Sequence, residues 1–556
     1  MSDELVSRVT AWIAGDPDET DRQTLELLLA EGATEELARR FAAPLRFGTA
    51  GLRGPVMAGA AGMNRYTVRR ATQGVAAWLL TGPVDAGRGV VVGRDARRGS
   101  ELFNDEVVAV LLGAGIPVYE MPGPLPTPLV AFAVRELSAA AGIMITASHN
   151  PPGDNGYKLY DVSGSQIIGP DDEIVERFAA AASMPNLGTR DDPRYHRMPA
   201  QVIEEYHRHA LARFAPPAPS ALRIVYTPLH GVGGATMTSL LREAGYRAIS
   251  VVAEQFEPDG RFPTLPFPNP EEPGALDRAI ARADEVGADL VLANDPDADR
   301  LGVAAREGAT WRVLRGDQIG WLLASVLLPE AGVNDVVATS IVSSMMLESM
   351  ARDAGVAYVT TLTGFKWIAR AAGNRTLAFG YEEALGFAVD ARVADKDGLT
   401  AALALARLAD ELAGRGETLL DRLDAIEERY GVHVVDQLSI RDDGPGGRAR
   451  IVAAVERLRE DPPHEIGGLA VDEVVDLAAG GRGLPPTNGV VLVAPPARVV
   501  VRPSGTEAKL KAYLEVVVEP GDERPLDERR RGANTLLAAI RDDLGRRLAL
   551  ARDADR

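Results

Sequence analysis

The stretch GIMITASHNPPGDNGYKLY, residues 142–160, starts as an apolar run and becomes a loop of Asn, Pro and Gly at Ser148. Residues 140–146 predict a buried strand, because a short apolar run bounded by turn residues is typical of a parallel sheet. The loop that follows ends at Lys158. A serine placed where the strand gives way to the loop requires a chemical explanation.

The flanking sequence predicts an α/β organisation around this strand. Residues 89–94, GVVVGR, form a second apolar run, and residues 101–113 between the two runs have helical periodicity. A proline-rich bridge at residues 214–223 precedes a strand in residues 224–234 and then a helix. Residues 288–306 predict a strand, an acidic loop and another strand.

The C-terminal part has a different pattern, because apolar and polar residues alternate through residues 498–518. Alternation of this kind predicts an antiparallel sheet. No repeat of fixed period is visible, which excludes solenoids and propellers. We therefore expect four domains, namely α/β domains at residues 1–212, 213–315 and 316–430 and an α+β domain at residues 431–556.

The composition is that of a globular protein, with 46% apolar and 25% charged residues in a chain of 556. No apolar stretch reaches the about 18 residues that a membrane span needs, and the N-terminus lacks a secretory signal, so we expect a cytoplasmic protein. The net charge of -19 argues against nucleic acid or a membrane surface as partner, but it permits a small anionic substrate. The absence of cysteine excludes disulfides, thiolate metal sites and cysteine nucleophiles.

Lysine is rare in this chain, which has five lysines among its 60 basic residues. Because the other basic residues are all arginine, each lysine is a candidate for a position that needs a compact ammonium group, with chance retention as the alternative. The five are Lys158, Lys366, Lys396, Lys509 and Lys511.

The acidic loop NDPDADR, residues 294–300, places three carboxylates two residues apart, at Asp295, Asp297 and Asp299. Three carboxylates this close repel one another, so a divalent cation is their natural partner, and Mg²⁺ is favoured because few protein ligands are offered. An EF-hand is excluded because Arg300 and Arg306 stand where it needs Gly and Glu. The acid-nucleophile loop of haloacid-dehalogenase-like phosphatases and a solvated turn remain as alternatives.

The loop VRPSGTEAKLKAY, residues 501–513, is a candidate phosphate-binding site. Arg502, the hydroxyls of Ser504 and Thr506, and the backbone N–H groups around Gly505 form a cluster of donors that fits a phosphate monoester. The nearby Lys509 and Lys511 favour anion binding over an ordinary turn.

Several other motifs have a chemical and a structural interpretation. Glu382 and Glu383 in GYEEALGF fit either a sugar-hydroxyl contact or the first turn of a helix. Lys396 in DKDG fits either a proton carrier or a solvated turn.

His149 beside Ser148 is a candidate general base, but the G-x-S-x-G pattern is absent, which argues against a serine hydrolase. The glycine-dense LRFGTAGLRG, residues 45–54, ends in Arg53 and is weak evidence alone.

Taken together, these stretches resemble the α-D-phosphohexomutase superfamily. TASHNPPGDNGYK, DPDADR, GYEEALG and RPSGTEAKLK look like its phosphoserine, magnesium, sugar and phosphate loops, in the family's order. Four further motifs are similar in sequence to those of the phosphoglucomutase-2-like branch, which includes phosphopentomutases and sugar-bisphosphate synthases. They are FGTAGLRG, YTPLHGVGG, TLTGFKW and DKDG. The resemblance implies three α/β domains with mixed sheets and a C-terminal α+β domain around a central cleft.

The resemblance also implies a mechanism in which Ser148 is phosphorylated and a bisphosphorylated sugar serves as activator and intermediate. By this resemblance Arg53, Lys158 and Arg300 stabilise the transferring phosphoryl group, and Lys158 or Lys396 carries the hydroxyl proton, which requires a depressed lysine pKa. The implied metal ligands of Mg²⁺ are the phosphate on Ser148 and Asp295, Asp297 and Asp299. The implied substrate-binding residues are Arg300, Thr363, Gly364, Glu382, Glu383, Arg502, Ser504, Gly505 and Thr506.

Two residues depart from the pattern. Many phosphoglucomutases have Ser where Ala384 follows the paired glutamates, and the usual Pro of the phosphate loop is Ala508. We expect a phosphohexomutase acting on glucose or mannose phosphate, with a phosphopentomutase and a non-enzymatic phosphosugar-binding protein as alternatives. The oligomeric state is not predicted.

Overall fold

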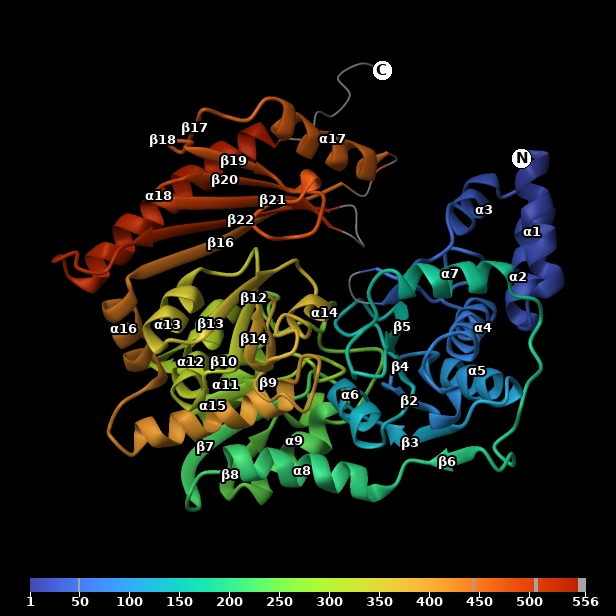
Figure 1. Ribbon diagram of the computed structural model, residues 1–556, viewed down its shortest axis with the longest axis horizontal. Helices are drawn as coiled ribbons and strands as arrows, with labels where there is room; N and C mark the ends of the chain where they lie inside the picture. Colours follow the sequence, from blue (N-terminus) through green and yellow to red (C-terminus); the bar gives the residue numbers. More distant parts are fainter. Residues whose placement is uncertain (49–50, 443, 445, 505–508, 549–556) are drawn as a thin grey trace. The chain divides into compact units, whose positions relative to one another are not determined.

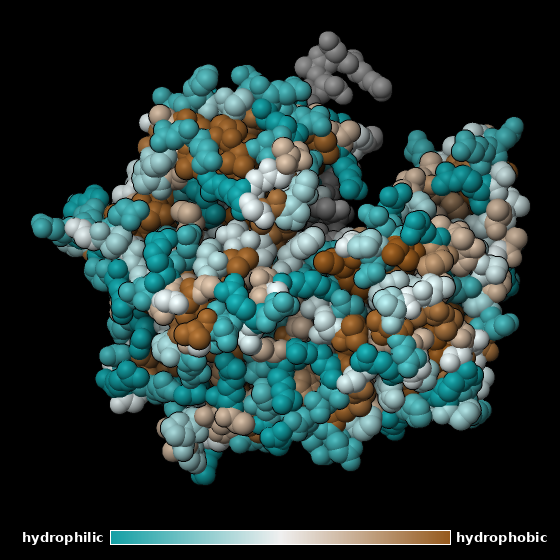
Figure 2. Space-filling view, viewed as in Figure 1, coloured by the Kyte–Doolittle hydropathy of each residue, from teal (hydrophilic) through white to brown (hydrophobic). Residues whose placement is uncertain are grey.

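The computed structural model describes residues 1–48, 51–442, 444, 446–504 and 509–548 (Figure 1). The chain divides into two compact units, one formed by Met1–Leu314 and Ala384–Gly416 and the other by Arg315–Glu383 and Glu417–Arg556. Among the described residues, no helix combines the length and apolar character that crossing a bilayer requires. Hydrophilic side chains, with scattered apolar patches between them, cover the face seen in Figure 2.

The first unit begins with three helices and a six-stranded mixed sheet. The strand order is β1-β5-β4-β2-β3-β6, in which β2 is parallel to both β4 and β3, and β5 is antiparallel to β1 and β4. The strands are β1 (Leu52–Pro55), β2 (Val90–Arg94), β3 (Val118–Pro124), β4 (Ala141–Ile145), β5 (Asp154–Tyr160) and β6 (Tyr195–Arg197). The helices are α1 (Asp3–Gly15), α2 (Glu19–Ala30), α3 (Thr34–Arg40), α4 (Arg65–Thr81), η1 (Ala86–Arg88), α5 (Ser100–Gly113), α6 (Thr127–Glu136) and α7 (Asp171–Ala181).

The predicted strands at the centre of this sheet are present. All five residues of β4 are buried, as are four of the five in β2, because the helices α5 and α6 pack against these strands. This agrees with their continuous apolar sequences. The strand β4 ends three residues before Ser148, so the core of the sheet places the serine loop.

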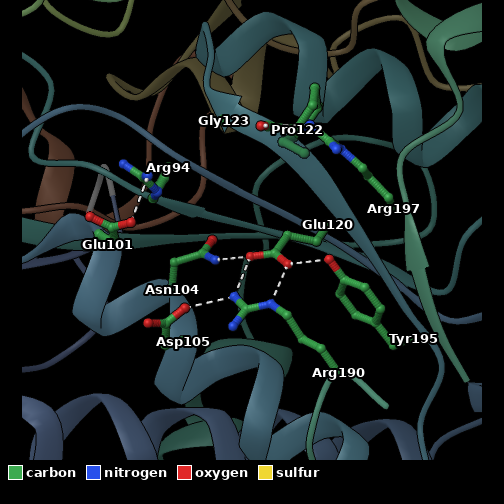
Figure 3. A pocket seen from close by; sticks show the side chains of 11 residues that line it. Arg94, Glu101, Asn104, Asp105, Glu120, Pro122, Gly123, Arg190, Tyr195 and Arg197 are labelled. Carbon is green, nitrogen blue, oxygen red and sulfur yellow. Dashed lines mark hydrogen bonds and ion pairs between the residues drawn. The ribbon is translucent and has the colours of Figure 1, made fainter. Parts of the chain in front are cut away.

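A buried carboxylate ties the edge of this sheet to the segment that leads into β6 (Figure 3). Glu120 of β3 accepts hydrogen bonds from Arg190, Tyr195 and Asn104, with distances of 2.5–2.8 Å. These groups line a polar pocket of about 210 Å³. Since three arginines and three carboxylates line it, the pocket carries no net charge, and its contacts hold the sheet together.

The first unit continues with a five-stranded sheet of order β11-β10-β9-β7-β8, parallel at β9-β7-β8 and antiparallel at β9-β10-β11. The acidic loop joins β9 to β10, as the sequence predicts. The elements are α8 (Ala200–Phe214), β7 (Ser220–Thr227), α9 (Gly233–Glu243), β8 (Tyr246–Val251), α10 (Ala253–Phe256), α11 (Asp277–Val286), β9 (Leu290–Ala293), β10 (Gly302–Glu307), β11 (Thr310–Val313), β15 (Gly386–Ala388) and α15 (Gly398–Ala413).

The second unit begins with a sheet in which β12 is parallel to both β13 and β14. Helix α16 then leads to the C-terminal part of the chain. The elements are α12 (Gly316–Leu327), η2 (Leu328–Glu330), β12 (Asp335–Ser340), α13 (Met346–Ala354), β13 (Ala357–Thr361), α14 (Phe365–Ile368), β14 (Thr376–Glu382) and α16 (Leu419–Tyr430).

The C-terminal sheet is antiparallel, with order β16-β22-β21-β20-β19, which confirms the prediction made from the alternation of its sequence. Helices α17 and α18 cover one face of it (Figure 1). The predicted fold class, three α/β domains with mixed sheets and a C-terminal α+β domain, is therefore confirmed. The elements are β16 (Val432–Arg441), α17 (Gly447–Glu460), β17 (Glu465–Ile466), β18 (Leu469–Ala470), β19 (Glu473–Asp476), η3 (Leu477–Ala479), β20 (Val490–Ala494), β21 (Ala497–Pro503), β22 (Lys509–Val518) and α18 (Leu526–Arg547).

Candidate active site

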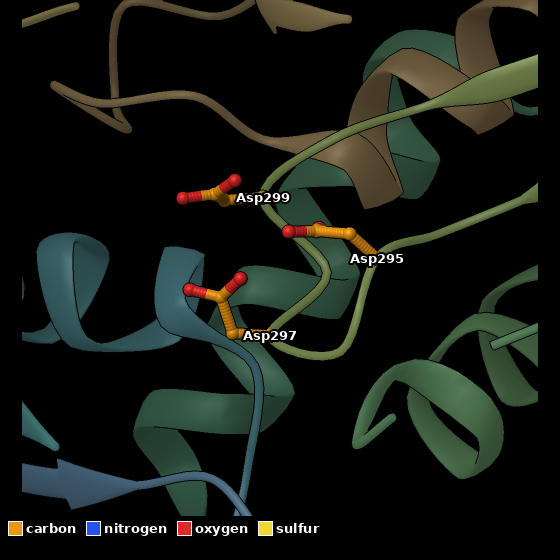
Figure 4. Close-up of side chains that lie close together, drawn as sticks. All are labelled: Asp295, Asp297 and Asp299. Atoms are coloured by element: carbon orange, nitrogen blue, oxygen red, sulfur yellow. The ribbon is translucent and has the colours of Figure 1, made fainter. Parts of the chain in front are cut away.

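The acidic loop between β9 and β10 brings its three carboxylates together (Figure 4). Asp295, Asp297 and Asp299 are fully buried, and one oxygen of each lies within 4.8 Å of the others. The loop can turn this sharply because Ala298 adopts a positive φ of 56°. Below it, Val232 N donates to Pro296 O at 2.9 Å, and a Cβ on Gly231 would lie 2.4 Å from the Pro296 Cα. The HGVGG sequence therefore supports the acidic loop.

The electrostatics of this cluster favour a cation. Burial, together with the charges of Asp297 and Asp299, raises the pKa of Asp295 well above its usual range. One oxygen of Asp297 and one of Asp299, both Oδ1, are buried without a hydrogen-bond partner. Orphaned carboxylate oxygens are expensive to bury, so the residues fit a hard divalent cation such as Mg²⁺.

Ser148 faces this cluster from the neighbouring sheet. Its Oγ donates to Asp295 Oδ2 at 2.7 Å, and its backbone N–H donates to Thr146 Oγ1 at 2.9 Å. Ser148 has a φ of 52°, in the left-handed region that residues other than glycine rarely adopt. A buried serine hydroxyl held in a strained backbone against a carboxylate is typical of a functional site.

His149 lies between Ser148 and Arg300. Its Nδ1 is 3.1 Å from Ser148 Oγ, and its Nε2 is 3.4 Å from Arg300 Nη2. Because a guanidinium only donates, Nε2 is the acceptor and the ring proton is on Nδ1. Burial and the charges of Arg300 and Arg53 hold the pKa of His149 well below its usual range, so the ring is neutral. In this tautomer Nδ1 donates toward Ser148 Oγ.

Lys158 is fully buried, and its Nζ donates to Asp297 Oδ2 at 2.7 Å and to Asp299 Oδ2 at 2.6 Å. Burial acts to lower its pKa, but the two carboxylates outweigh burial and raise it. The expectation of a depressed pKa is therefore wrong for Lys158 in this arrangement, because the acidic cluster stabilises the ammonium form.

Lys396 approaches the same carboxylates from the DKDG loop, with its Nζ 3.3 Å from Asp299 Oδ2. Gly386 makes this approach possible, since a Cβ there would lie 2.3 Å from the Lys396 Cδ. Burial acts to raise the pKa of Asp299, but the charges of Lys158, Lys396 and Arg300 hold it well below its usual range.

Arg53 reaches the serine loop from β1. The pairing of β1 with β5 places Arg53 opposite Gly156, and its Nη1 donates to Asn150 Oδ1 at 3.3 Å. Burial lowers the pKa of Arg53, and the nearby aspartates oppose this. The structure therefore brings the predicted residues of this unit together around Ser148, namely Arg53, His149, Lys158, Arg300, Lys396 and the three aspartates of the acidic loop.

Sequence reasoning missed Asp95 and Arg97, which hold the serine loop. The buried guanidinium of Arg97 donates to four backbone oxygens of that loop: Ser148 O, Asn150 O, Pro151 O and Asp154 O. Asp95 accepts from Thr146 Oγ1 at 2.7 Å and from Arg97 N at 2.9 Å. The signal was present, because charged residues directly follow the buried strand β2, which pairs with β4.

Thr127 was also missed. Its Oγ1 donates to Asp297 Oδ2 at 2.5 Å, and its backbone N–H donates to Asp297 O at 2.9 Å. It is the first residue of α6, and it links the first sheet of this unit to the acidic loop. Thr127 stands in the sequence GPLPTP, in which nothing distinguishes it from a helix-starting threonine.

The second unit holds the paired glutamates at the end of β14. Glu382 Oε1 accepts from Gly364 N at 2.6 Å, and Gly364 has a φ of 110°, which suits glycine. Glu383 Oε2 lies within 3.3 Å of the hydroxyls of Ser340 and Ser343. The structure thus brings Thr363, Gly364 and both glutamates to one edge of the sheet, where β13 and β14 end, and it rules out the helix N-terminus alternative for GYEEALGF.

The predicted phosphate loop joins β21 to β22 in the same unit. Arg502 pairs with Lys511 across these strands, and Ser504 N donates to Lys509 O at 2.7 Å. Arg502, Ser504, Lys509 and Lys511 therefore lie at one end of this hairpin. The predicted residues Gly505 and Thr506, and the departure at Ala508, lie outside the described residues.

Comparison with protein families gives three consecutive matches. Residues 44–185 match phosphoglucomutase/phosphomannomutase alpha/beta/alpha domain I, residues 204–308 match domain II, and residues 315–430 match domain III. The matches are in the order of the family and together cover more than half of the chain.

Individual relatives extend the match. A probable phosphomannomutase of Haemophilus influenzae is 38% identical over 82% of this chain and 93% of its own length. The phosphopentomutase of Homo sapiens is 34% identical over 96% of this chain and 95% of its own. Among solved structures, a putative phosphomannomutase from Thermus thermophilus has a TM-score of 0.66, with 25% identity over 88% of this chain and 99% of that one.

Proposed function

The chain belongs to the phosphoglucomutase/phosphomannomutase family and is an enzyme of the mutase class, and from its site we propose that it interconverts hexose 1-phosphate and hexose 6-phosphate through a phosphorylated Ser148. One observation carries this proposal. The loop holds Ser148 in a left-handed backbone conformation, and the Ser148 Oγ donates to Asp295 inside a cluster of three buried aspartates and two lysines.

In the proposed reaction, the phosphoryl group on Ser148 passes to a free hydroxyl of the sugar phosphate. The bond from phosphorus to Ser148 Oγ breaks, a bond to the sugar oxygen forms, and the hydroxyl proton passes to the amine of Lys396, since Lys158 is held as an ammonium group. The sugar then carries two phosphates. Its other phosphoryl group returns to Ser148 Oγ, and the proton returns to the oxygen that is left behind, which yields the isomer.

Transfer of this kind depends on positioning and on stabilisation of negative charge. Arg53, Arg300 and Lys158 supply positive charge around Ser148, while Arg97 fixes the loop that carries it. His149, a neutral donor toward Ser148 Oγ, orients the hydroxyl. Asp295, Asp297 and Asp299 would hold Mg²⁺, which when bound neutralises charge on the phosphoryl oxygens.

We propose that the second unit recognises the substrate. Arg502 and Ser504, together with Gly505 and Thr506, bind the phosphate that does not react, because a planar guanidinium and hydroxyl donors fit a phosphate monoester. Glu382 and Glu383 accept hydrogen bonds from sugar hydroxyls, and Thr363 and Gly364 shape the same edge. A sugar bisphosphate is the activator, because it can phosphorylate Ser148.

A phosphopentomutase is the second candidate, and two observations favour it. Ala384 removes a hydroxyl next to the paired glutamates, and the human relative that covers 96% of the chain is named a phosphopentomutase. Hexose and pentose phosphates differ by one carbinol group, so the two activities differ in recognition and share the chemistry.

A coupled isomerisation assay tests the proposal. With Mg²⁺ and a trace of glucose 1,6-bisphosphate, kcat/KM is compared for glucose 1-phosphate, mannose 1-phosphate and ribose 1-phosphate. We expect a hexose to be the preferred substrate. If ribose 1-phosphate is the preferred substrate, the protein is a phosphopentomutase. If none of the three sugar phosphates is turned over, the result supports the phosphosugar-binding alternative.

A further inference from the structure

The loop of residues 341–345, between β12 and α13, contacts the C-terminal sheet within the second unit. Ile341 and Val342 belong to one apolar cluster with Val491, Val500 and Tyr513 of that sheet. Ser343 and Ser344 are also buried, although both are polar. Buried serines need hydrogen-bond partners, so the partners of this loop show what it is built to hold.

Arg498 of β21 grips the backbone of this loop. Its Nη1 donates to Ile341 O at 3.1 Å, and its Nη2 donates to Ser343 O at 2.6 Å. Nη2 also donates to Glu515 Oε2 at 2.8 Å, from the position directly opposite on β22. Only arginine presents a planar fork that reaches two carbonyls and a carboxylate at once. We call this set of bonds the Arg498 clamp.

Glu515 completes the clamp. Its Oε1 accepts from Ser344 Oγ at 2.7 Å, from Met345 N at 3.0 Å and from His433 Nδ1 at 2.8 Å. Burial opposes ionisation, but Arg498 and His433 lower the pKa of Glu515 to about 2. The carboxylate is therefore charged at neutral pH and fixes the guanidinium of Arg498.

The same loop also holds Glu383. Ser343 Oγ lies 3.2 Å from Glu383 Oε2, and Glu383 N donates to Ser343 Oγ at 3.3 Å. Ser343 is thus bonded through its side chain to Glu383 and through its carbonyl to Arg498. It is a one-residue link between the sugar-recognising glutamate and the C-terminal sheet.

Arg498 and the phosphate-binding Arg502 stand on one strand, β21. They are four residues apart and so lie on the same face, with their backbone positions about 14 Å apart at about 3.4 Å per residue. Val500 between them packs against the 341–345 loop, which shows that this face is the one turned to that loop. The strand therefore carries both the clamp and the predicted phosphate contact.

We propose that Arg498 is a positioning residue that sets the spacing between the phosphate contact at Arg502 and Glu383, and thereby determines the length of phosphosugar that the enzyme accepts. This inference rests on the proposed function. A hexose phosphate is longer than a pentose phosphate by one carbon–carbon bond, about 1.5 Å. A clamped spacing discriminates between the two lengths, whereas a loose spacing accepts both.

The first test compares substrate preference in variants of the clamp. Arg498→Met removes all three bonds, Arg498→Lys keeps the charge without the fork, and Arg459→Met is a control that breaks a pair with Asp476 elsewhere in the C-terminal domain. The ratio of kcat/KM for glucose 1-phosphate and ribose 1-phosphate is measured for each. We expect the ratio to move at least about tenfold toward one in Arg498→Met, less in Arg498→Lys, and not at all in the control. If Arg498→Met lowers both rates alike and leaves the ratio unchanged, the specificity role is wrong.

The second test needs no substrate. Because the chain has no cysteine, spin labels at Glu348→Cys and Glu473→Cys report the distance between the two domains of the second unit by pulsed electron resonance. We expect Arg498→Met, but not Arg459→Met, to broaden this distance distribution while circular dichroism stays unchanged. An unchanged distribution overturns the clamp. If the wild-type enzyme isomerises no sugar, the proposed function fails, and the distance measurement still decides whether the clamp exists.

Discussion

The cluster around Ser148 and the cluster around Glu383 both contain carboxylates, but different partners hold them. Asp295, Asp297 and Asp299 are fully buried and face the side-chain nitrogens of Lys158 and Lys396. Glu382 and Glu383 are only partly buried, and their contacts include a backbone N–H and two serine hydroxyls.

In the proposed function, this difference separates charge stabilisation from recognition. A buried cluster that mixes carboxylates and ammonium groups creates a strong local field, which suits the transfer of a charged phosphoryl group. Carboxylates that are only partly buried keep the capacity to accept further hydrogen bonds, which suits sugar hydroxyls. Changes in the first cluster should therefore affect kcat, and changes in the second should affect KM and preference.

The largest expected effect comes from Ser148→Ala. Removing the proposed nucleophile should lower kcat at least about a thousandfold, because the phosphoryl group then has no acceptor in the proposed reaction. Binding of phosphosugar, measured by calorimetry, should persist, since the recognising residues are unchanged. Ser163→Ala, at an exposed serine of the same domain, is the control. Full activity in Ser148→Ala would remove the basis for assigning charge stabilisation to the first cluster.

The next effect concerns the metal. Asp297→Asn should lower kcat by about a hundredfold or more, since it weakens the site for a charge-neutralising cation. In the wild type, Mg²⁺ at a hundred times its dissociation constant should raise the free energy of unfolding by about 2.7 kcal/mol. This rise, followed by thermal unfolding, should shrink in Asp297→Asn and persist in the exposed control Asp284→Asn. Equal stabilisation of both variants would place the metal elsewhere.

A smaller effect is expected in the second cluster. Glu383→Gln should raise KM by about 10- to 100-fold with a lesser change in kcat, because it weakens the proposed hydrogen bonds to sugar hydroxyls, of roughly 1–3 kcal/mol. Steady-state kinetics with the preferred sugar phosphate measure this, with Glu348→Gln as a control in the same unit. A loss confined to kcat would instead show that Glu383 acts in the chemical step.

The smallest effect is on stability. Burial, with the charges of Glu383 and Glu515, raises the pKa of Asp317 to about 7, from 3.8 in the unfolded chain. The folded state then binds the extra proton between these two values, so the contribution of Asp317 to stability falls as the pH rises from about 4 to about 7. Asp317→Asn should remove this dependence. In urea titrations between pH 5 and 7, the free energy of unfolding of Asp317→Asn should fall by roughly 1–3 kcal/mol less than that of the wild type. Parallel curves would contradict the raised pKa.

The sequence predicted much of the first cluster because its residues are close together in the chain. Asp295, Asp297 and Asp299 form one loop, and Ser148 and Lys158 flank another, so local spacing carries the information. The antiparallel C-terminal sheet followed from alternation for the same reason.

The missing parts depend on distant residues. Arg97 holds the serine loop from the turn that follows β2, and Thr127 holds Asp297 across 170 positions. The raised pKa of Lys158 follows from two carboxylates about 140 residues away, so its sign could not be read from neighbours in the sequence. The link from Glu383 through Ser343 to Arg498 spans more than 100 residues, so no local sequence motif predicts it. The residue boundaries of the four domains remain a prediction.

The most direct test of the account is to locate the phosphoryl group. The protein is incubated with Mg²⁺ and glucose 1,6-bisphosphate, digested, and analysed by mass spectrometry. The account predicts one added phosphoryl group, on the peptide that contains Ser148, which disappears when excess glucose 1-phosphate is added and is absent in Ser148→Ala. A phosphoryl group on another residue, or turnover without any phosphorylated form of Ser148, would contradict it.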